Sequence, residues 1–203
     1  LLLVGAFSVL GAYAVETRTW TDATGNHLWT DKRNWSPSID GNLYNIFPAG
    51  DWGGVIDDIG ELNYYYSLEL SEGSGTVTIK DSTGSNYLRP ATGGYIKIPS
   101  GRELNIDGPQ LVISITDISS TGFIDGTLRL TSGYLNTGKS HSKTFGGNAK
   151  IVVGGGIFGN KETSGTLTFT NNATLTINGG LAKIWRGVFC SPDSPLESIV
   201  RVR

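Results

Sequence analysis

The chain has 203 residues, a length sufficient for one ordinary domain with a sizeable buried core. Its residues are 38% hydrophobic and only 17% charged, which is too apolar for a disordered tail. The 16 basic residues are scattered singly and the net charge is −2, which argues against binding to nucleic acid or to an anionic membrane surface. The 29 glycines are about twice the usual share and indicate many short strands and turns.

Residues 1–14 form an uncharged, mostly apolar run that is followed at once by polar residues. The run ends in Ala12-Tyr13-Ala14, the small-x-small pattern of a signal-peptidase site, so we expect a secretory signal core that is cleaved after Ala14. Two alternatives stay open: an apolar helix retained as an anchor or assembly stem, and a buried pair of strands. We therefore expect an extracellular or cell-surface location, with membrane contact only through residues 1–14 if they remain uncleaved.

Residues 15–70 contain four of the five tryptophans and few glycine-marked strands, so we expect a distinct, aromatic-rich N-terminal cap there. Trp20, Trp29 and Trp35 allow two interpretations: their rings plug the end of a core, or they present flat faces to sugars. Their spacing follows a turn rather than an alternating exposed face, which favours a structural cap. The first coil of a stacked β-fold exposes an apolar cross-section and a strand edge, and both need a cover.

These tryptophans belong to a motif that spans residues 19–36. It consists of Thr19-Trp20, a turn at Gly25, a second tryptophan at Trp29 and then Asn34-Trp35-Ser36. The motif resembles the N-terminal segment of secreted, autotransporter-like bacterial proteins with a pectin-lyase-like β-helix. In that group the tryptophan motif follows the signal peptide and leads into glycine-rich repeats, and the order of segments here is the same. The resemblance implies a parallel β-helix and an exported protein, and it implies no particular activity.

A second aromatic group lies later in the same segment. It comprises Trp52 together with Tyr64, Tyr65 and Tyr66. Successive residues of a strand face opposite sides, so at least one of three consecutive tyrosines points away from the core. This group is our candidate ligand-binding surface.

Asp57 and Asp58 form the tightest acidic pair and are weak candidates for binding calcium through their hard oxygen atoms. Adjacent carboxylates in a strand point apart, and no calcium-loop motif surrounds them, so we expect a solvated loop and no metal site. No His, Cys or acidic residue stands at metal-ligand spacing to either histidine, His27 or His141, and no G-x-S-x-G nucleophile elbow is present. We therefore name no catalytic residue and expect no cofactor.

Residues 71–190 repeat short alternations of apolar and polar residues that are separated by glycines or polar turns, for example at 76–79, 127–130 and 174–177. This pattern fits a right-handed parallel β-solenoid or, alternatively, a β-sandwich. Short strands and irregular joins favour the solenoid. The interval of 19 residues between Ile79 and Ile98 is close to one coil if a coil takes about 20 residues. The interval of 39 residues between the Gly-Thr-Leu sequences at 126 and 165 is then close to two coils.

The last segment, residues 191–203, is expected to be a truncated continuation of the repeats or a tail. The lone Cys190 leaves the chain without an intramolecular disulfide. Taken together, the segments favour an exported, non-enzymatic structural or adhesion module whose partners are polysaccharide or other cell-surface components. One alternative is a self-assembling extracellular filament subunit, in which residues 1–14 dock into a neighbouring copy. The other is a β-helix protein that binds or degrades polysaccharide.

Overall fold

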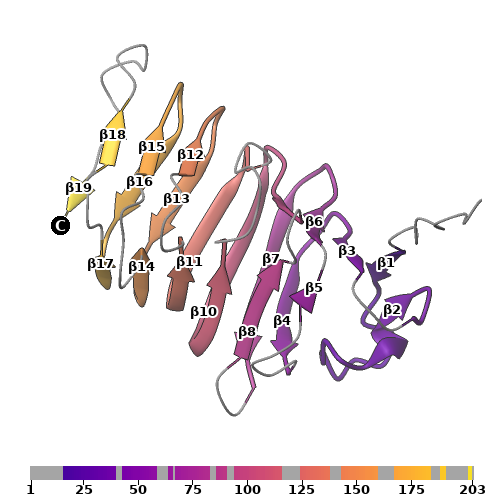
Figure 1. The fold of residues 1–203 in the computed structure, drawn as a ribbon. Helices are drawn as coiled ribbons and strands as arrows, with labels where there is room; N and C mark the ends of the chain where they lie inside the picture. Colours follow the sequence, from indigo (N-terminus) through magenta and orange to yellow (C-terminus); the bar gives the residue numbers. More distant parts are fainter. Residues whose placement is uncertain are drawn as a thin grey trace, which may run out of the picture.

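The computed structural model describes residues 16–39, 43–58, 64–65, 67–82, 86–90, 94–115, 124–137, 143–159, 167–183, 188–190 and 201–202. Within these residues the chain is almost entirely β, and parallel strands stack into a solenoid of about five turns (Figure 1). The predicted parallel β-solenoid is confirmed, and the β-sandwich alternative is excluded. The one helical segment in these ranges is the 3₁₀ turn η1 (Lys32–Asn34). The predicted signal core at 1–14 and the segment 191–200 lie outside the described residues.

The strands form three sheets. The first sheet contains, in spatial order, β2 (Trp35–Ser36), β1 (Thr17–Trp20), β3 (Tyr44–Phe47), β6 (Ser67–Leu70) and β9 (Ile96–Lys97). The main path of the large sheet contains β4 (Trp52–Asp57), β7 (Gly75–Asp81), β10 (Arg102–Ser114), β11 (Thr127–Asn136), β13 (Lys150–Val153), β16 (Thr174–Ile177) and β19 (Arg201–Val202). Joined to its side are β5 (Tyr64–Tyr65), β8 (Asn86–Pro90), β14 (Ile157–Gly159) and β17 (Leu181–Lys183). The third sheet contains β12 (Lys143–Phe145), β15 (Leu167–Phe169) and β18 (Val188–Cys190).

Among these strands only β1 and β2 pair in antiparallel fashion; the other pairs are parallel, with register shifts in β4–β7 and in β10–β11 after Ile106. The inward-facing residues of the large sheet therefore stack in two apolar columns. One column contains Val77, Leu104, Leu128, Ile151 and Leu175, and the other contains Ile79, Ile106, Leu130, Val153 and Ile177. All ten are buried. Burying one such side chain contributes about 1.5–3 kcal/mol, so this repeated stacking is a main source of stability.

The register corrects the coil length that the sequence suggested. Leu104, Leu128, Ile151 and Leu175 pair in turn, so successive coils advance by 24, 23 and 24 residues. Ile79 pairs with Ile106 and not with the residue at 98, which forms its bridge with Ile124 instead. The shorter estimate was wrong because each coil contributes apolar alternations to more than one sheet, and intervals counted along the chain mixed the sheets.

One corner of the solenoid is lined by stacked glycines. Gly133, Gly156 and Gly180 have φ of 90°, 70° and 75°, a left-handed conformation that favours glycine. A Cβ on each would lie 2.4, 2.3 and 2.5 Å from the carbonyl oxygen of the glycine one coil earlier. Neighbouring coils therefore meet backbone to backbone at this corner, which accounts for part of the high glycine content.

Candidate functional site

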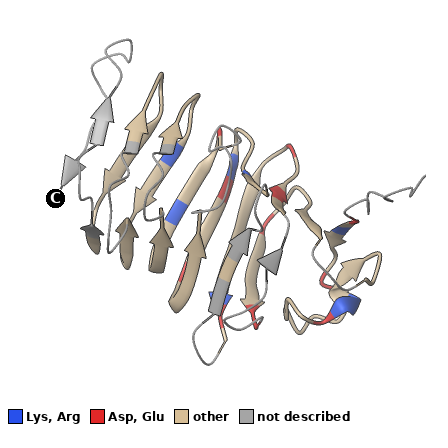
Figure 2. Ribbon diagram, in the orientation of Figure 1, with Lys and Arg blue, Asp and Glu red and all other residues tan. Residues whose placement is uncertain are grey.

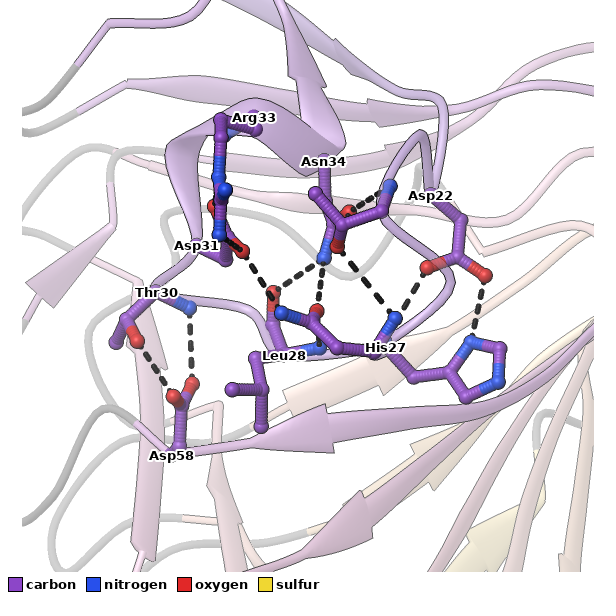
Figure 3. Close-up of polar contacts among 10 residues, drawn as sticks. Asp22, His27, Leu28, Thr30, Asp31, Arg33, Asn34 and Asp58 are labelled. Carbon is purple, nitrogen blue, oxygen red and sulfur yellow. Dashed lines mark hydrogen bonds and ion pairs between the residues drawn. The ribbon is translucent and has the colours of Figure 1, made fainter.

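The loop at residues 21–34, which precedes the stacked coils, is organised around the side chain of Asn34, which is fully buried. Asn34 Oδ1 accepts hydrogen bonds from the N–H and the hydroxyl of Thr24 at 3.0 and 2.6 Å. Asn34 Nδ2 donates to Asn26 Oδ1 at 2.7 Å and to the carbonyl of Leu28 at 3.1 Å (Figure 3). A side-chain amide has two N–H donors and two acceptor lone pairs, so all four are used. One buried side chain thus links three positions of the loop, Thr24, Asn26 and Leu28.

Two carboxylates of the loop are held by residues of the same loop. Asp22 Oδ2 lies 2.5 Å from His27 Nδ1, and Asp22 Oδ1 accepts a hydrogen bond from the backbone N–H of His27 at 3.2 Å (Figure 3). Asp31 caps η1 by accepting the N–H of Arg33, and it also receives Arg33 Nε and Nη2 at 2.9 and 2.8 Å. These hydrogen bonds from the Arg33 guanidinium hold the pKa of Asp31 well below its usual range.

The three tryptophans predicted as a cap lie together at the first coil, packed around Phe47. Ring centroids of Trp35 are 4.8 Å from Trp20 and 5.0 Å from Trp29, and all three rings lie within 5.7 Å of the Phe47 ring. Trp35 Nε1 donates to the carbonyl of Trp29 at 2.8 Å, and Arg18 lies over the Trp35 ring at 4.2 Å. Each tryptophan is only 1–2% exposed, so none offers a ring face to a sugar.

The same loop also covers the outer edge of β4, the first strand of the large sheet. Ile56 donates its N–H to the carbonyl of His27 at 2.8 Å, and Trp29 donates its N–H to the carbonyl of Ile56 at 2.9 Å. In the first sheet, the antiparallel strand β2 pairs with the edge of β1. Unpaired strand edges act as templates for pairing with other chains. The loop therefore covers the first strand of the large sheet, and β2 covers the edge of β1.

The two calcium candidates, Asp57 and Asp58, lie in different surroundings. Asp57 is fully buried and pairs in register with Asp81 on β7. Asp58 accepts hydrogen bonds from the N–H and the hydroxyl of Thr30 at 2.8 and 2.5 Å (Figure 3). Within the described ranges, no group of three or more His, Cys, Asp or Glu side chains could hold a metal ion.

The second aromatic group is only partly described. Trp52 is half-buried, packs against the hydrophobic core and donates its Nε1 to the carbonyl of Pro48 at 3.1 Å. Tyr64 and Tyr65 form β5, which pairs with Arg89 and Pro90 of β8, and Tyr66 lies outside the described residues. The structure thus places Trp52 against the core and does not establish a shared aromatic surface with the tyrosines.

The outward face of the large sheet carries contacts between coils that the sequence did not reveal. Arg129 donates Nε and Nη2 to the two carboxylate oxygens of Glu103 at 2.9 and 3.0 Å, and these hydrogen bonds raise the pKa of Arg129. Thr131 donates to Asn105 Oδ1 at 2.7 Å. Elsewhere on the described ribbon the charges are scattered (Figure 2). Arg129 and Glu103 are 26 residues apart, a spacing that gains meaning only once the coil length is known.

Other side chains tie one coil to the next through its backbone. Three aspartates each accept an N–H from the following coil: Asp51 from Thr76, Asp81 from Gln110 and Asp125 from Asn148, at 2.8, 2.6 and 2.8 Å. Arg102 is buried and donates to the carbonyls of Ser74 and Pro48 at 3.2 and 2.9 Å, and its burial lowers its pKa. Hydrogen bonds of charged groups are stronger than neutral ones, so these contacts hold neighbouring coils together.

These observations define the class of the molecule as a parallel β-solenoid whose first coil is covered by a tryptophan-rich loop. Comparison of the chain with protein-family models, curated proteins and solved structures found no match. The fold supports the β-helix part of the resemblance, whereas no comparison supports its autotransporter or pectin-lyase part. In the part of the chain that is described, no helix has the length and apolar character needed to cross a membrane.

Proposed function

We propose that the chain is a non-enzymatic structural or adhesion module of an exported, autotransporter-like bacterial protein that contacts polysaccharide or other cell-surface components. The observation that carries the proposal is the unshifted register along the first part of five successive strands of the large sheet, β7, β10, β11, β13 and β16. Its outward residues succeed one another strand by strand, as in the column Thr76, Glu103, Thr127, Lys150 and Thr174. Strands are about 4.8 Å apart, so four steps span about 19 Å. A long, flat array of this kind suits contact with an extended polymer.

Stiffness is the second property that supports this function. Each outward column of the large sheet is backed by the two apolar columns of the core, and contacts such as Arg129 with Glu103 link one coil to the next. A stacked solenoid with a closed core resists local opening because each coil is held by its neighbours. An adhesive module exposed to proteases and mechanical load benefits from both properties.

The test is attachment by cells that display the chain. The whole chain is fused to an unrelated outer-membrane anchor, and retention under flow is measured on surfaces coated with polysaccharides, matrix proteins or cell envelopes. Cells that display the anchor alone are the control, and protease resistance of the displayed chain confirms folding. Retention above the control is expected on at least one surface. Retention equal to the control on every surface, with the chain folded, would overturn the proposal.

Export is the part of the proposal that depends on residues 1–14. Expression of the chain with its leader in a bacterium should give a mature protein that begins at Val15 and is found outside the cytoplasm. Mass spectrometry of the recovered N-terminus decides the point. A chain that stays in the cytoplasm with residues 1–14 intact would contradict export.

A further inference from the structure

The outward face of the first sheet carries two tyrosines, Tyr44 and Tyr95, whose rings lie side by side. Their centroids are 6.0 Å apart although the strand β6 separates their backbones. On β6 the residue between them is Ser67, which pairs with Tyr44 and accepts the N–H of Tyr95 on its hydroxyl at 3.1 Å. Two strand spacings measure about 9.5 Å. The rings can meet because a serine, and not a larger side chain, stands between them.

A charged pair stands beside these rings. Glu69 accepts hydrogen bonds from the hydroxyl of Tyr95 at 3.1 Å and from the ammonium of Lys97 at 2.8 Å. The Glu69 and Lys97 side chains remain 22% and 34% exposed, so a ligand in solution can reach both. The hydrogen bond to Glu69 fixes the orientation of the Tyr95 ring. The site therefore combines a preformed aromatic surface with a carboxylate and an ammonium group.

We infer that Tyr44, Tyr95, Glu69 and Lys97 form a binding site for a neutral polysaccharide. This inference names the partner for the proposed adhesion and therefore rests on that function. Sugar rings present apolar C–H faces, which pack on aromatic rings, and hydroxyl groups, which need both donors and acceptors. Small-ligand sites commonly combine aromatic contact with a few placed polar groups of this kind.

The charge of the site selects a neutral ligand. Glu69 and Lys97 neutralise each other at 2.8 Å, so neither sign of charge is left to attract an acidic or a basic polymer. An acidic sugar would face the carboxylate of Glu69, and a basic sugar would face the ammonium of Lys97. Each would meet one like charge beside one opposite charge, so a charged sugar would lose hydration at this site without a net electrostatic gain. A neutral sugar can instead donate a hydroxyl to Glu69 and accept a hydrogen bond from Lys97.

Affinity electrophoresis of the whole chain tests the site. Native gels contain one of three neutral polysaccharides (mixed-linkage β-glucan, galactomannan or dextran) or one of two acidic ones (polygalacturonate or alginate). Retardation is expected with at least one neutral polymer and with neither acidic polymer. Tyr95→Ala should weaken binding about 10-fold through loss of ring contact. Lys97→Met should weaken it about 5-fold through loss of a hydrogen-bond donor.

Matched controls come from other parts of the chain. Tyr134→Ala removes a half-buried tyrosine of β11 that follows the corner at Gly133, and Lys32→Met removes an exposed lysine of η1; neither should change the retardation. Circular dichroism checks the fold of each variant. If Tyr95→Ala does not fold, the test of the site rests on Tyr95→Phe and Lys97→Met. Tyr95→Phe keeps the ring and removes only the hydrogen bond to Glu69.

The outcomes separate this site from the proposed adhesion. Three results would each overturn the site. They are no retardation by any neutral polymer, equal retardation of wild type and of the Tyr95 and Lys97 variants, and retardation by the acidic polymers. If cells that display the chain attach equally well with and without Tyr95→Ala, the binding site is overturned and the adhesion proposal stands. Conversely, gel retardation that depends on Tyr95, with no attachment by displayed cells, supports the site and overturns adhesion.

Discussion

Gly156 allows a quantitative test of how neighbouring coils stack. An alanine at this position would place its Cβ 2.3 Å from the carbonyl oxygen of Gly133 and 2.8 Å from its nitrogen, with φ at 70°. The Cβ–oxygen distance would have to open from 2.3 Å to at least 3.0 Å, and backbone atoms must move to allow it. Overpacking costs about 1–3 kcal/mol, and a left-handed conformation costs a non-glycine residue about 1–2 kcal/mol. We therefore expect Gly156→Ala to lower the free energy of unfolding by about 2–5 kcal/mol.

Gly154 provides the matched control two residues away. A Cβ there would have its nearest neighbour, the carbonyl oxygen of Leu130, at an ordinary contact distance of 3.7 Å, and its φ is not positive. Gly154→Ala should be neutral or stabilise by about 0.4–1 kcal/mol, because alanine restricts the unfolded chain.

The assay is urea unfolding of the whole chain followed by far-ultraviolet circular dichroism. With a slope of about 2 kcal/mol per molar urea, the midpoint of Gly156→Ala should fall by about 1–2.5 M relative to wild type. The midpoint of Gly154→Ala should stay near that of wild type. If the two variants unfold at the same urea concentration, close backbone contact is not what excludes side chains at this corner, and the reasoning is refuted.

Three further predictions concern the loop and the contacts between coils. Asn34→Ala removes four hydrogen bonds and should lower the free energy of unfolding by about 2–4 kcal/mol. The measurement is urea unfolding followed by tryptophan fluorescence, and an unchanged urea midpoint would show that the loop does not depend on Asn34. Asp125→Ala should lower the free energy of unfolding by about 1 kcal/mol because the N–H of Asn148 loses its acceptor. Asp125→Asn keeps an acceptor oxygen and should lower it less; equal losses of stability in the two variants would contradict this prediction. The Asp31 carboxyl should titrate by NMR below the ordinary Asp value of about 3.9, and Arg33→Gln should raise its pKa. Because the pKa of Asp31 is lower in the folded chain than in the unfolded chain, its contact with Arg33 stabilises the fold at pH values above the ordinary carboxyl pKa. This stabilisation is lost as the pH falls through the pKa of the folded state. If Arg33→Gln leaves the titration midpoint of Asp31 unchanged, the Arg33 guanidinium is not what lowers this pKa.

The strands themselves were predictable from the sequence, and their partners were not. The alternation at 76–79, 127–130 and 174–177 corresponds to residues of β7, β11 and β16, because one inward face of each strand must be apolar. Which strands are neighbours depends on the length of each coil. Each coil contributes apolar alternations to more than one sheet, so counting intervals along the chain gave about 20 residues where the register gives 23 to 27.

The residues of the sites differ in how visible they are in the sequence. The tryptophans stand out because the residue is rare and the motif is local. Asn34 belongs to the same motif, but nothing in the sequence indicates that its side chain makes four hydrogen bonds to the loop. Tyr44 and Tyr95 are far apart along the chain and become neighbours only when two coils and the serine between them are placed in register. Contacts of this kind require the coil register, which a single sequence does not supply.

The motif at residues 19–36 combines tryptophans with small polar residues because the first coil exposes two different surfaces. Its apolar cross-section around Phe47 needs large rings, and the indoles of Trp20, Trp29 and Trp35 fill that space. The free N–H and C=O groups of β4 need backbone partners, which a ring cannot supply; residues 27–29 provide them only while Asn34 holds the loop in place. Tryptophans alone would leave a strand edge open to other chains, and a polar loop alone would leave Phe47 in water. A chain that begins a parallel solenoid therefore needs both kinds of residue within one short segment.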